Sequence, residues 1–278
     1  MLVILRWTYA QTGPEAAVRI ARFKRVLRAA QRTQRYQSVL EGAGLATAEA
    51  LASIDSVEHT LKRLPAIELL EFRNSPASFE SPGGTSPTPQ AFRSPLDHTP
   101  KIAILMPGFE QTSRVKVMAQ NWSRNLKRFG ASALAAPLTV LREVAAAVES
   151  GQQELQGLKH FVIPFTGGEQ GELAQEDRER FWRVFQVPLF EQRLGFDGRV
   201  VAYECEAHSG LHILPERAAF EEAADSELLL TSLTDLHYPT LRIGTRLGGS
   251  IQHECCDCGN AAARLVGLNP LAAAAAAC

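Results

Sequence analysis

The side chains that could hold a metal ion gather in the last third of the chain. Cys205 and His212 lie in one short segment, and Cys256 and Cys258 lie in another, further along. Thiolate and imidazole are the ligands that zinc prefers, and three cysteines with one histidine complete a tetrahedron. Gly259 comes next and would let the chain turn tightly enough for two thiolates to face one ion. We therefore predict a zinc site formed by Cys205, His212, Cys256 and Cys258.

The residue types leave alternatives open. His208 competes with His212 as the imidazole ligand, and Cys255 competes with Cys256 as a thiolate ligand. The cysteines could also be free thiols that lie close together by chance. If four protein ligands do bind the ion, no position remains for water, so the zinc would be structural rather than catalytic. The sequence contains no His-Glu-x-x-His, which is the commonest signature of a zinc hydrolase.

A second candidate site, for a ligand, consists of Thr166, Gly167, Gly168 and Glu169. This segment follows an expected strand and precedes an expected helix, which is where open α/β sheets place ligands. The alternative is a simple turn that starts the helix, in which Glu169 only interacts favourably with the positive end of the helix.

Composition limits the possible classes of protein. The 278 residues are 45% hydrophobic and 21% charged, which is typical of a globular chain. The formal net charge of -1 favours neither nucleic acid nor a membrane as partner. No apolar run reaches the roughly 18 residues of a membrane span, and the apolar start meets Arg6 too early for a signal peptide. Five unevenly placed cysteines are typical of a reducing compartment, so we expect a cytoplasmic protein.

Helical periodicity dominates the front of the chain. Pro14 suits a first helical turn, residues 14–64 have a helical pattern, and a second helix is expected near 48–61. The many arginines of this region are more typical of a solvated helix face than of an interaction surface. Proline, glycine and serine then crowd residues 74–100, which predicts a linker after a helical lead-in at 1–73.

From residue 101 onward, short apolar segments alternate with amphipathic ones. Strands are expected at 102–106, 161–165, 188–190, 199–203, 227–231 and 240–243. Helices are expected at 115–129, 138–148 and 172–184. The alternation predicts an α/β fold with some parallel pairing over 101–268. Its strand-rich end, about 199–268, would form a small zinc-stapled β subdomain, followed by an alanine-rich tail at 269–278.

Several segments, in the right order, resemble the phenylacetate–coenzyme A ligase family of AMP-forming, or adenylate-forming, enzymes. The resemblance is best over about 158–268. The similar segments are Thr166–Glu169 with Glu176–Arg180, Val201–Cys205 with Gly210–Ile213, Glu227–Thr234, Pro239–Arg242, and Cys256–Gly259 with Arg264–Leu265.

This resemblance implies a fold like part of the large domain of adenylate-forming enzymes. It implies activation of a carboxylate by ATP and magnesium, through an acyl-adenylate, and transfer of the acyl group to coenzyme A. In some family members the corresponding cysteines and histidine bind zinc. The expected ligand is a small aromatic or acyl carboxylate, and no catalytic residue is assigned. The residues expected to contact the ligand are Thr166, Gly167, Gly168, Glu169, Asp197 and Arg242.

The sequence also departs from the family pattern where the nucleotide would bind. The candidate phosphate loop, Ser81–Pro87, has no lysine, and its prolines remove backbone donors. In place of the family's Tyr-Gly-x-Ser/Thr-Glu stands Leu194–Gly198, where Asp197 is the only acid. The segment Arg242–Leu247 lacks the aspartate that holds the ribose, a hydrogen bond worth roughly 1.5–3 kcal/mol.

The chain also matches the family over a reduced length. The stretch from Thr85 to Gly168 is shorter than in the family, and the sequence ends soon after Gly267, before the small domain that carries the family's catalytic lysine. We therefore predict a shortened, degenerate homologue in which zinc is kept and activation by ATP is weakened. The alternative is a non-catalytic, zinc-stabilised module that binds a small ligand or a protein partner.

Overall fold

The computed structural model describes residues 14–85, 88–118, 122–153, 155 and 157–271. The chain divides into two compact units. The first unit consists of Met1–Pro87, Ile213–Gln252 and Gly267–Cys278, and the second of Thr88–His212 and His253–Val266. Among the described residues, no helix has the length and apolar character needed to cross a membrane.

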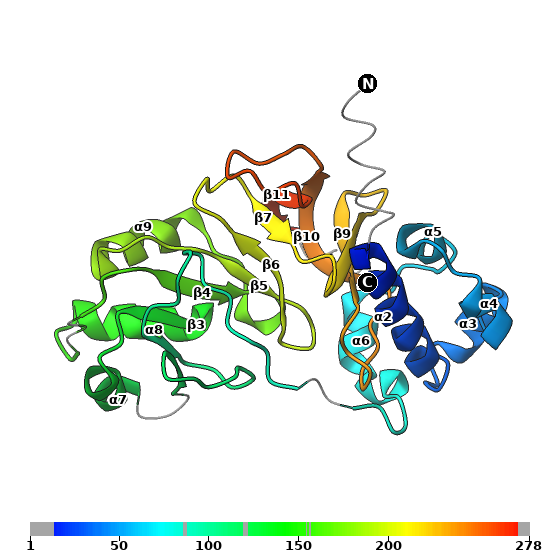
Figure 1. Ribbon diagram of the computed structural model, residues 1–278, viewed down its shortest axis with the longest axis horizontal. Coiled ribbons are helices and arrows are strands. Elements are labelled where there is room, and N and C mark those ends of the chain that lie inside the picture. Colours follow the sequence, from blue (N-terminus) through cyan, green and yellow to red (C-terminus); the bar gives the residue numbers. More distant parts are fainter. Residues whose placement is uncertain (1–13, 86–87, 119–121, 154, 156, 272–278) are drawn as a thin grey trace, which may run out of the picture. The chain divides into compact units, whose positions relative to one another are not determined.

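Short helices form the front of the first unit. They are α2 (Pro14–Ala30), α3 (Gln37–Gly42), α4 (Ala48–Ala52), α5 (Val57–Leu61), α6 (Leu69–Asn74) and the 3-10 turn η1 (Pro76–Phe79). Helix α2 packs against α4 and α5 (Figure 1). The prediction of one helix near 48–61 is wrong. The hydroxyl of Thr47 caps α4 and that of Ser56 caps α5, and a capping serine takes extended backbone that ends any continuous helix.

Basic side chains of α2 form hydrogen bonds and an ion pair with other residues of the first unit. Arg19 donates to the carbonyl of Pro215 at 2.9 Å and pairs with Glu58. Lys24 donates to the carbonyl of Ala52 at 2.7 Å. These contacts fasten α2 to its own neighbours.

Part of the proline- and glycine-rich segment is packed rather than free. Phe79 and Ser81 are fully buried. The hydroxyl of Ser81 donates to the carbonyl of Ala29 at 2.9 Å, and its N–H donates to the carbonyl of His237 at 2.8 Å. A Cβ on Gly84 would lie 2.2 Å from the carbonyl oxygen of Leu236, so only glycine fits there.

Three antiparallel strands complete the first unit: β8 (Ala218–Glu222), β9 (Glu227–Ser232) and β10 (Ile243–Gln252). The expected strand at 227–231 is confirmed as β9. The strand expected at 240–243 is wrong, because Arg242 has a φ of 53° and β10 begins only at Ile243. Strand β8 was not anticipated.

The second unit has a mixed sheet in the order β2, β1, β3, β4, β5, β6, β7, β11. The strands are β1 (Ile102–Ile104), β2 (Val115–Val117), β3 (Ala133–Pro137), β4 (Val162–Thr166), β5 (Gln192–Leu194), β6 (Val200–Glu204), β7 (Leu211–Ile213) and β11 (Arg264–Pro270), of which Ile213 and the residues from Gly267 onward belong to the first unit. Pairing is parallel from β2 to β5 and antiparallel for β5 with β6 and for β7 with β11. The expected α/β class with partly parallel pairing is therefore confirmed.

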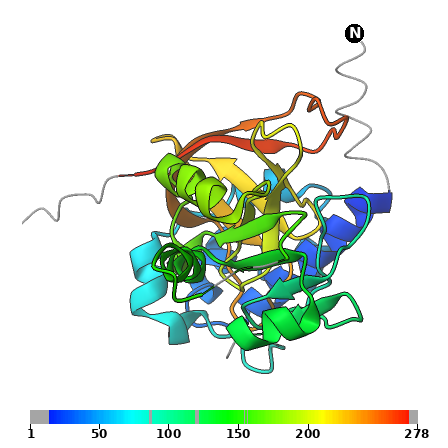
Figure 2. The same cartoon turned by 90° about the vertical axis from the view of Figure 1, so that its left-hand side faces the viewer.

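Helices α7 (Trp122–Phe129), α8 (Leu138–Glu149) and α9 (Gln175–Phe185) belong to the second unit. Helices α8 and α9 lie side by side (Figures 1 and 2), and α8 packs on β3 and β4. Leu141, Val144, Phe181 and Phe185 extend from these helices into the same apolar core.

In the second unit, one expected helix is confirmed only in part, one expected strand is wrong and one strand was missed. The helix expected at 115–129 is confirmed only for its second part, α7 (Trp122–Phe129). Val115–Val117 instead form strand β2, which the two β-branched valines favour. The strand expected at 188–190 is a single bridge between Leu189 and Val162, and the strand itself, β5, lies further along. Strand β3 was missed because alanine gives no strand signal.

Candidate metal centre

Two turns of the second unit position the four predicted zinc ligands. Cys205 follows the last residue of β6, and His212 lies in β7. The two strands are labelled in Figure 1. The segment 253–263 that carries Cys256 and Cys258 leads into β11, which pairs antiparallel with β7. Gly259 has a φ of 83°, and its N–H donates to the carbonyl of Cys256 at 2.8 Å, which closes the turn between the two thiols.

Two of the distances between the four ligand atoms match the edges of a tetrahedral zinc site. All four atoms are within 4.8 Å of one another. The sulfurs of Cys205 and Cys256 are 3.7 Å apart, and Cys258 Sγ is 3.4 Å from His212 Nε2. Bonds of about 2.3 Å to sulfur and about 2.0–2.1 Å to nitrogen, at tetrahedral angles, imply edges of about 3.8 and about 3.5 Å. The donor set and its geometry therefore fit zinc.

The two competing residues point elsewhere. Cys255 is exposed, and its thiol contacts the backbone carbonyl of Cys256. His208 places Nδ1 at 2.9 Å from Glu204 Oε1 and stacks its ring on Phe190. Neither belongs to the four-residue cluster.

Contacts around the cluster fix the orientation of its ligands. His212 directs Nε2 at the cluster, and its Nδ1 lies 3.3 Å from the carbonyl oxygen of Ala262, which suits a proton on Nδ1 and leaves Nε2 free for a metal. The Tyr203 ring lies beside the His212 ring. Asn260 Nδ2 donates to the Tyr203 hydroxyl at 2.8 Å, which joins the second turn to β6.

The surroundings of Cys205 and Cys256 shift the pKa values of their thiols in opposite directions. Burial raises the pKa of Cys205 to about 12. Burial acts in the same direction on Cys256, but hydrogen bonds from the Ser209 hydroxyl and the Cys258 backbone outweigh it and lower the pKa of Cys256 to about 6. The surroundings of Cys256 therefore favour the thiolate, which is the form that binds metal.

Gly210 offers a direct test of how the first turn is built. Its φ is 114°, and a Cβ there would lie 2.6 Å from the backbone carbonyl oxygen of Leu265. We expect Gly210→Ala to lower the free energy of unfolding by about 1–3 kcal/mol, because the turn must move away from β11. Chemical denaturation measures the loss. Gly198→Ala is the control, since its φ is also positive but no atom lies near its Cβ; equal losses in the two variants would contradict the close approach.

The predicted ligand loop is held by contacts of its own. The Thr166 hydroxyl donates to Glu191 Oε1 at 2.7 Å. A Cβ on Gly167 would lie 2.8 Å from the carbonyl oxygen of Leu194. Gly168–Gln170 form a 3-10 turn, and helix α9 starts only at Gln175, so the expected start of a helix at residue 172 is wrong. The side chain of Glu169 lies outside the described part of the structure.

An ion pair lies against this loop. Arg193 is 2% exposed and pairs with both carboxylate oxygens of Glu172, at 2.6 and 3.0 Å. Its side chain also lies within 3.4 Å of the position that a Cβ on Gly167 would take. The arginine therefore fills space beside the loop and has a carboxylate partner there.

The other two predicted ligand-binding residues have structural partners as well. Asp197 Oδ1 accepts the N–H of Arg199 at 3.1 Å in the turn between β5 and β6. Arg242 belongs to the first unit, where it donates to Glu221 Oε2 at 3.0 Å and to the carbonyl of Leu64.

Sequence reasoning missed a buried charged network in the second unit. Glu191 and Glu204 are 6% and 4% exposed. Arg178 donates to Glu191 Oε2 at 3.0 Å and to Glu204 Oε2 at 3.2 Å, and the N–H of Glu191 donates to Glu204 Oε2 at 2.7 Å. The available signal was a glutamate inside the apolar run before β5, where burial of an acid requires a partner.

The network predicts a pH dependence of stability. Burial raises the pKa of Glu191, although Thr166 and Arg178 act against it. A carboxyl group with a raised pKa in the folded state stabilises the fold below its ordinary pKa of about 4.3 and loses that contribution as pH rises through the folded-state pKa. We expect the free energy of unfolding of Glu191→Gln to fall less than that of the wild type as pH rises from about 4 to 7. Urea denaturation across this range tests it, and parallel curves would contradict it.

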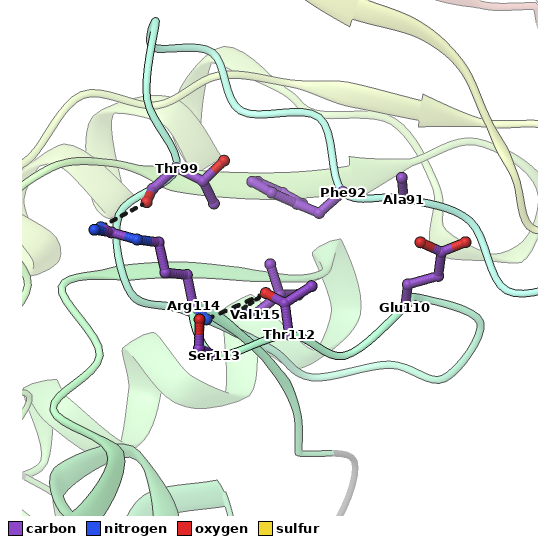
Figure 3. Close-up of a pocket in the computed structure, with 8 residues that line it drawn as sticks. All are labelled: Ala91, Phe92, Thr99, Glu110, Thr112, Ser113, Arg114 and Val115. Carbon is purple, nitrogen blue, oxygen red and sulfur yellow. Dashed lines mark hydrogen bonds between the residues drawn. The ribbon is translucent and has the colours of Figure 1, made fainter.

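A small open pocket lies elsewhere in the second unit (Figure 3). It measures about 280 Å³ and is lined by Ala91, Phe92, Thr99, Glu110, Thr112, Ser113, Arg114 and Val115. Arg114 donates to the carbonyl of Thr99 at 3.2 Å, and the Thr112 hydroxyl accepts the N–H groups of Arg114 and Val115. None of the predicted site residues lines this pocket.

Solved CoA ligases have a similar fold. 2-Hydroxyisobutyryl-CoA ligase in the postadenylation state, in complex with R3-HIB-AMP, matches with a TM-score of 0.66 at 12% identity, over 92% of this chain and 67% of that chain. The same ligase in an open conformation, with 2-HIB-AMP and CoA, matches with a TM-score of 0.64 at 11% identity, over 89% of this chain and 67% of that chain. No protein-family profile matches the sequence, and no curated protein matches it. The chain therefore has a fold similar to that of 2-hydroxyisobutyryl-CoA ligase.

Proposed function

We propose that this protein is a zinc-stabilised relative of the phenylacetate–CoA ligases that has lost efficient activation of carboxylates by ATP. The observation that carries the proposal is the cluster of Cys205, His212, Cys256 and Cys258, whose ligand atoms lie within 4.8 Å of one another in a fold similar to that of a CoA ligase. Four protein ligands close the coordination sphere of zinc, so the ion would join β6, β7 and the turn before β11 rather than activate water. Loss of metal would then release these segments from one another.

The loss of activation rests on what surrounds the ligand loop. Thr166 is bound to a buried glutamate, and Arg193 lies against Gly167 with Glu172 as its partner. In the sequence, the acidic residue that would hold a ribose is missing from Arg242–Leu247, and Ser81–Pro87 has no lysine for a phosphate. A nucleotide would have to displace existing pairs and would find few new partners, which favours a binding role over catalysis.

The metal arm of the proposal is tested on purified protein after dialysis against a weak chelator. Elemental analysis is expected to find stoichiometric zinc, and X-ray absorption is expected to show three sulfur ligands and one nitrogen ligand. Protein that is folded but free of metal would overturn this arm.

The catalytic arm is tested by isotopic ATP–pyrophosphate exchange with a panel of aromatic and aliphatic carboxylic acids. We expect no exchange above the background of a no-acid control. Acid-dependent exchange would establish the other candidate, an active ligase, which the similarity to 2-hydroxyisobutyryl-CoA ligase favours. Thermal-shift measurements with the same acids then test whether a small carboxylate still binds without being activated.

A further inference from the structure

Arg264 lies directly behind the metal cluster. It begins β11 and is the register partner of His212 on β7. Its side chain is only 7% exposed. The guanidinium Nη1 donates to the carbonyl oxygen of Ser209 at 2.8 Å and to the hydroxyl oxygen of Ser209 at 2.6 Å. Arg264 lies in one of the segments that resemble the ligase family, and that resemblance gives it no role.

Ser209 also contacts Cys256, one of the proposed metal ligands. Ser209 Oγ is 3.2 Å from Cys256 Sγ. Because a guanidinium can only donate, the serine oxygen accepts from Arg264 and its own hydrogen is free to point at the sulfur. A hydroxyl that accepts from a cation becomes a stronger donor, so the two bonds reinforce each other.

The positive charge of Arg264 would compensate the net negative charge of a zinc-loaded cluster. Three thiolates and one histidine around Zn²⁺ leave one net negative charge, and three of the four ligands are buried. A buried charge without compensation is costly. The guanidinium of Arg264 supplies the opposite charge one serine away from the cluster.

We propose that Arg264 and Ser209 form a hydrogen-bond relay to Cys256 Sγ that strengthens zinc binding and neutralises the site. Both are positioning residues, since neither contacts the metal. The proposal rests on zinc binding as proposed above. It predicts that the arginine acts through the serine, which a merely structural role would not require.

The test measures the zinc affinity of purified full-length variants by competition with a chromophoric chelator. Ser209→Ala and Arg264→Met are each expected to weaken zinc binding by about 10–100-fold, the usual effect of residues that support metal ligands. The double variant should be little weaker than Ser209→Ala alone, because both substitutions break one relay. Arg142→Met is the control, as it removes an arginine–aspartate pair between α8 and α9 in the same unit.

Cobalt provides a second readout that general destabilisation does not move. In Co²⁺-loaded protein, loss of the hydrogen bond raises the energy of the sulfur lone pairs, so the thiolate-to-cobalt charge-transfer band of Ser209→Ala should move to longer wavelength. Arg264→Lys should restore part of the affinity lost in Arg264→Met, because lysine keeps the charge but not the paired donors.

The outcomes separate the two proposals. If the wild type binds no zinc or cobalt, the zinc site and the relay both fall. If the wild type binds metal but Ser209→Ala has the same affinity and the same cobalt spectrum, only the relay is overturned. Additive losses in the double variant also overturn it. Ser209→Ala keeps the test decisive should Arg264→Met fail to fold, since it removes a single hydroxyl from a half-buried turn.

Discussion

Replacing Cys256 with serine is expected to abolish stoichiometric zinc binding and to produce the largest loss of stability of any single substitution in the second unit. Structural zinc contributes its binding free energy to folding, about 10–16 kcal/mol in zinc-finger peptides. Serine cannot supply a thiolate, and the buried Cys205 and the partly buried Cys258 would be left without an ion. Even a loss of about 3 kcal/mol would lower the melting temperature by roughly 6–12 °C in a protein of this size. Elemental analysis and calorimetry measure the two effects.

The matched control is the adjacent cysteine. Cys255 is exposed and its thiol lies outside the cluster, so Cys255→Ser should keep both the zinc and the melting temperature of the wild type. If Cys255→Ser loses zinc and Cys256→Ser keeps it, Cys255 rather than Cys256 is the zinc ligand. Retention in both variants would argue against thiolate binding by this turn.

Replacing Arg178 with methionine is expected to lower the free energy of unfolding by about 3 kcal/mol at neutral pH, because it leaves two buried carboxylates without their cation. Arg178 connects α9 with Glu191 before β5 and with Glu204 at the end of β6. Glu204 directly precedes Cys205, a proposed metal ligand, so the loss should also loosen that turn. The deficit should shrink in acid, because burial raises the pKa of Glu191 and this carboxyl group loses its charge as the pH falls.

Arg180→Met on the same helix serves as the control. Arg180 pairs with Glu149 at 2.7 Å, but this pair lies at the surface, where ion pairs contribute little. Urea denaturation of the two variants at neutral and acidic pH separates the effects. Equal stability losses, or a loss for Arg178→Met that does not depend on pH, would contradict the network.

The sequence predicted strands correctly where the strand is buried and its residues are apolar. The expected segments at 199–203 and 227–231 correspond to β6 and β9, which are apolar, mostly buried runs. The pattern failed where local preference and tertiary pairing differ. Ala133–Pro137 forms a central strand although alanine does not favour strands, because β1 and β4 flank it on both sides.

Backbone conformation was also invisible in the sequence. Arg242 takes a left-handed conformation that arginine rarely adopts, and this displaces β10 from its expected start. The hydrogen bonds of its guanidinium to Glu221 and Leu64 come from segments far away in the chain. No local pattern contains such partners.

The sequence by itself predicted the chemistry of the proposed metal centre, because thiolate and imidazole at close spacing within two segments are sufficient to suggest zinc. It left the choice between His208 and His212, and between Cys255 and Cys256, undecided. Only the tertiary structure shows which side chains cluster, since the pairing of β7 with β11 brings His212 to the second turn while His208 contacts Glu204 and Phe190. Side-chain type is local information, whereas the direction in which a side chain points depends on strand register and on partners distant in the chain.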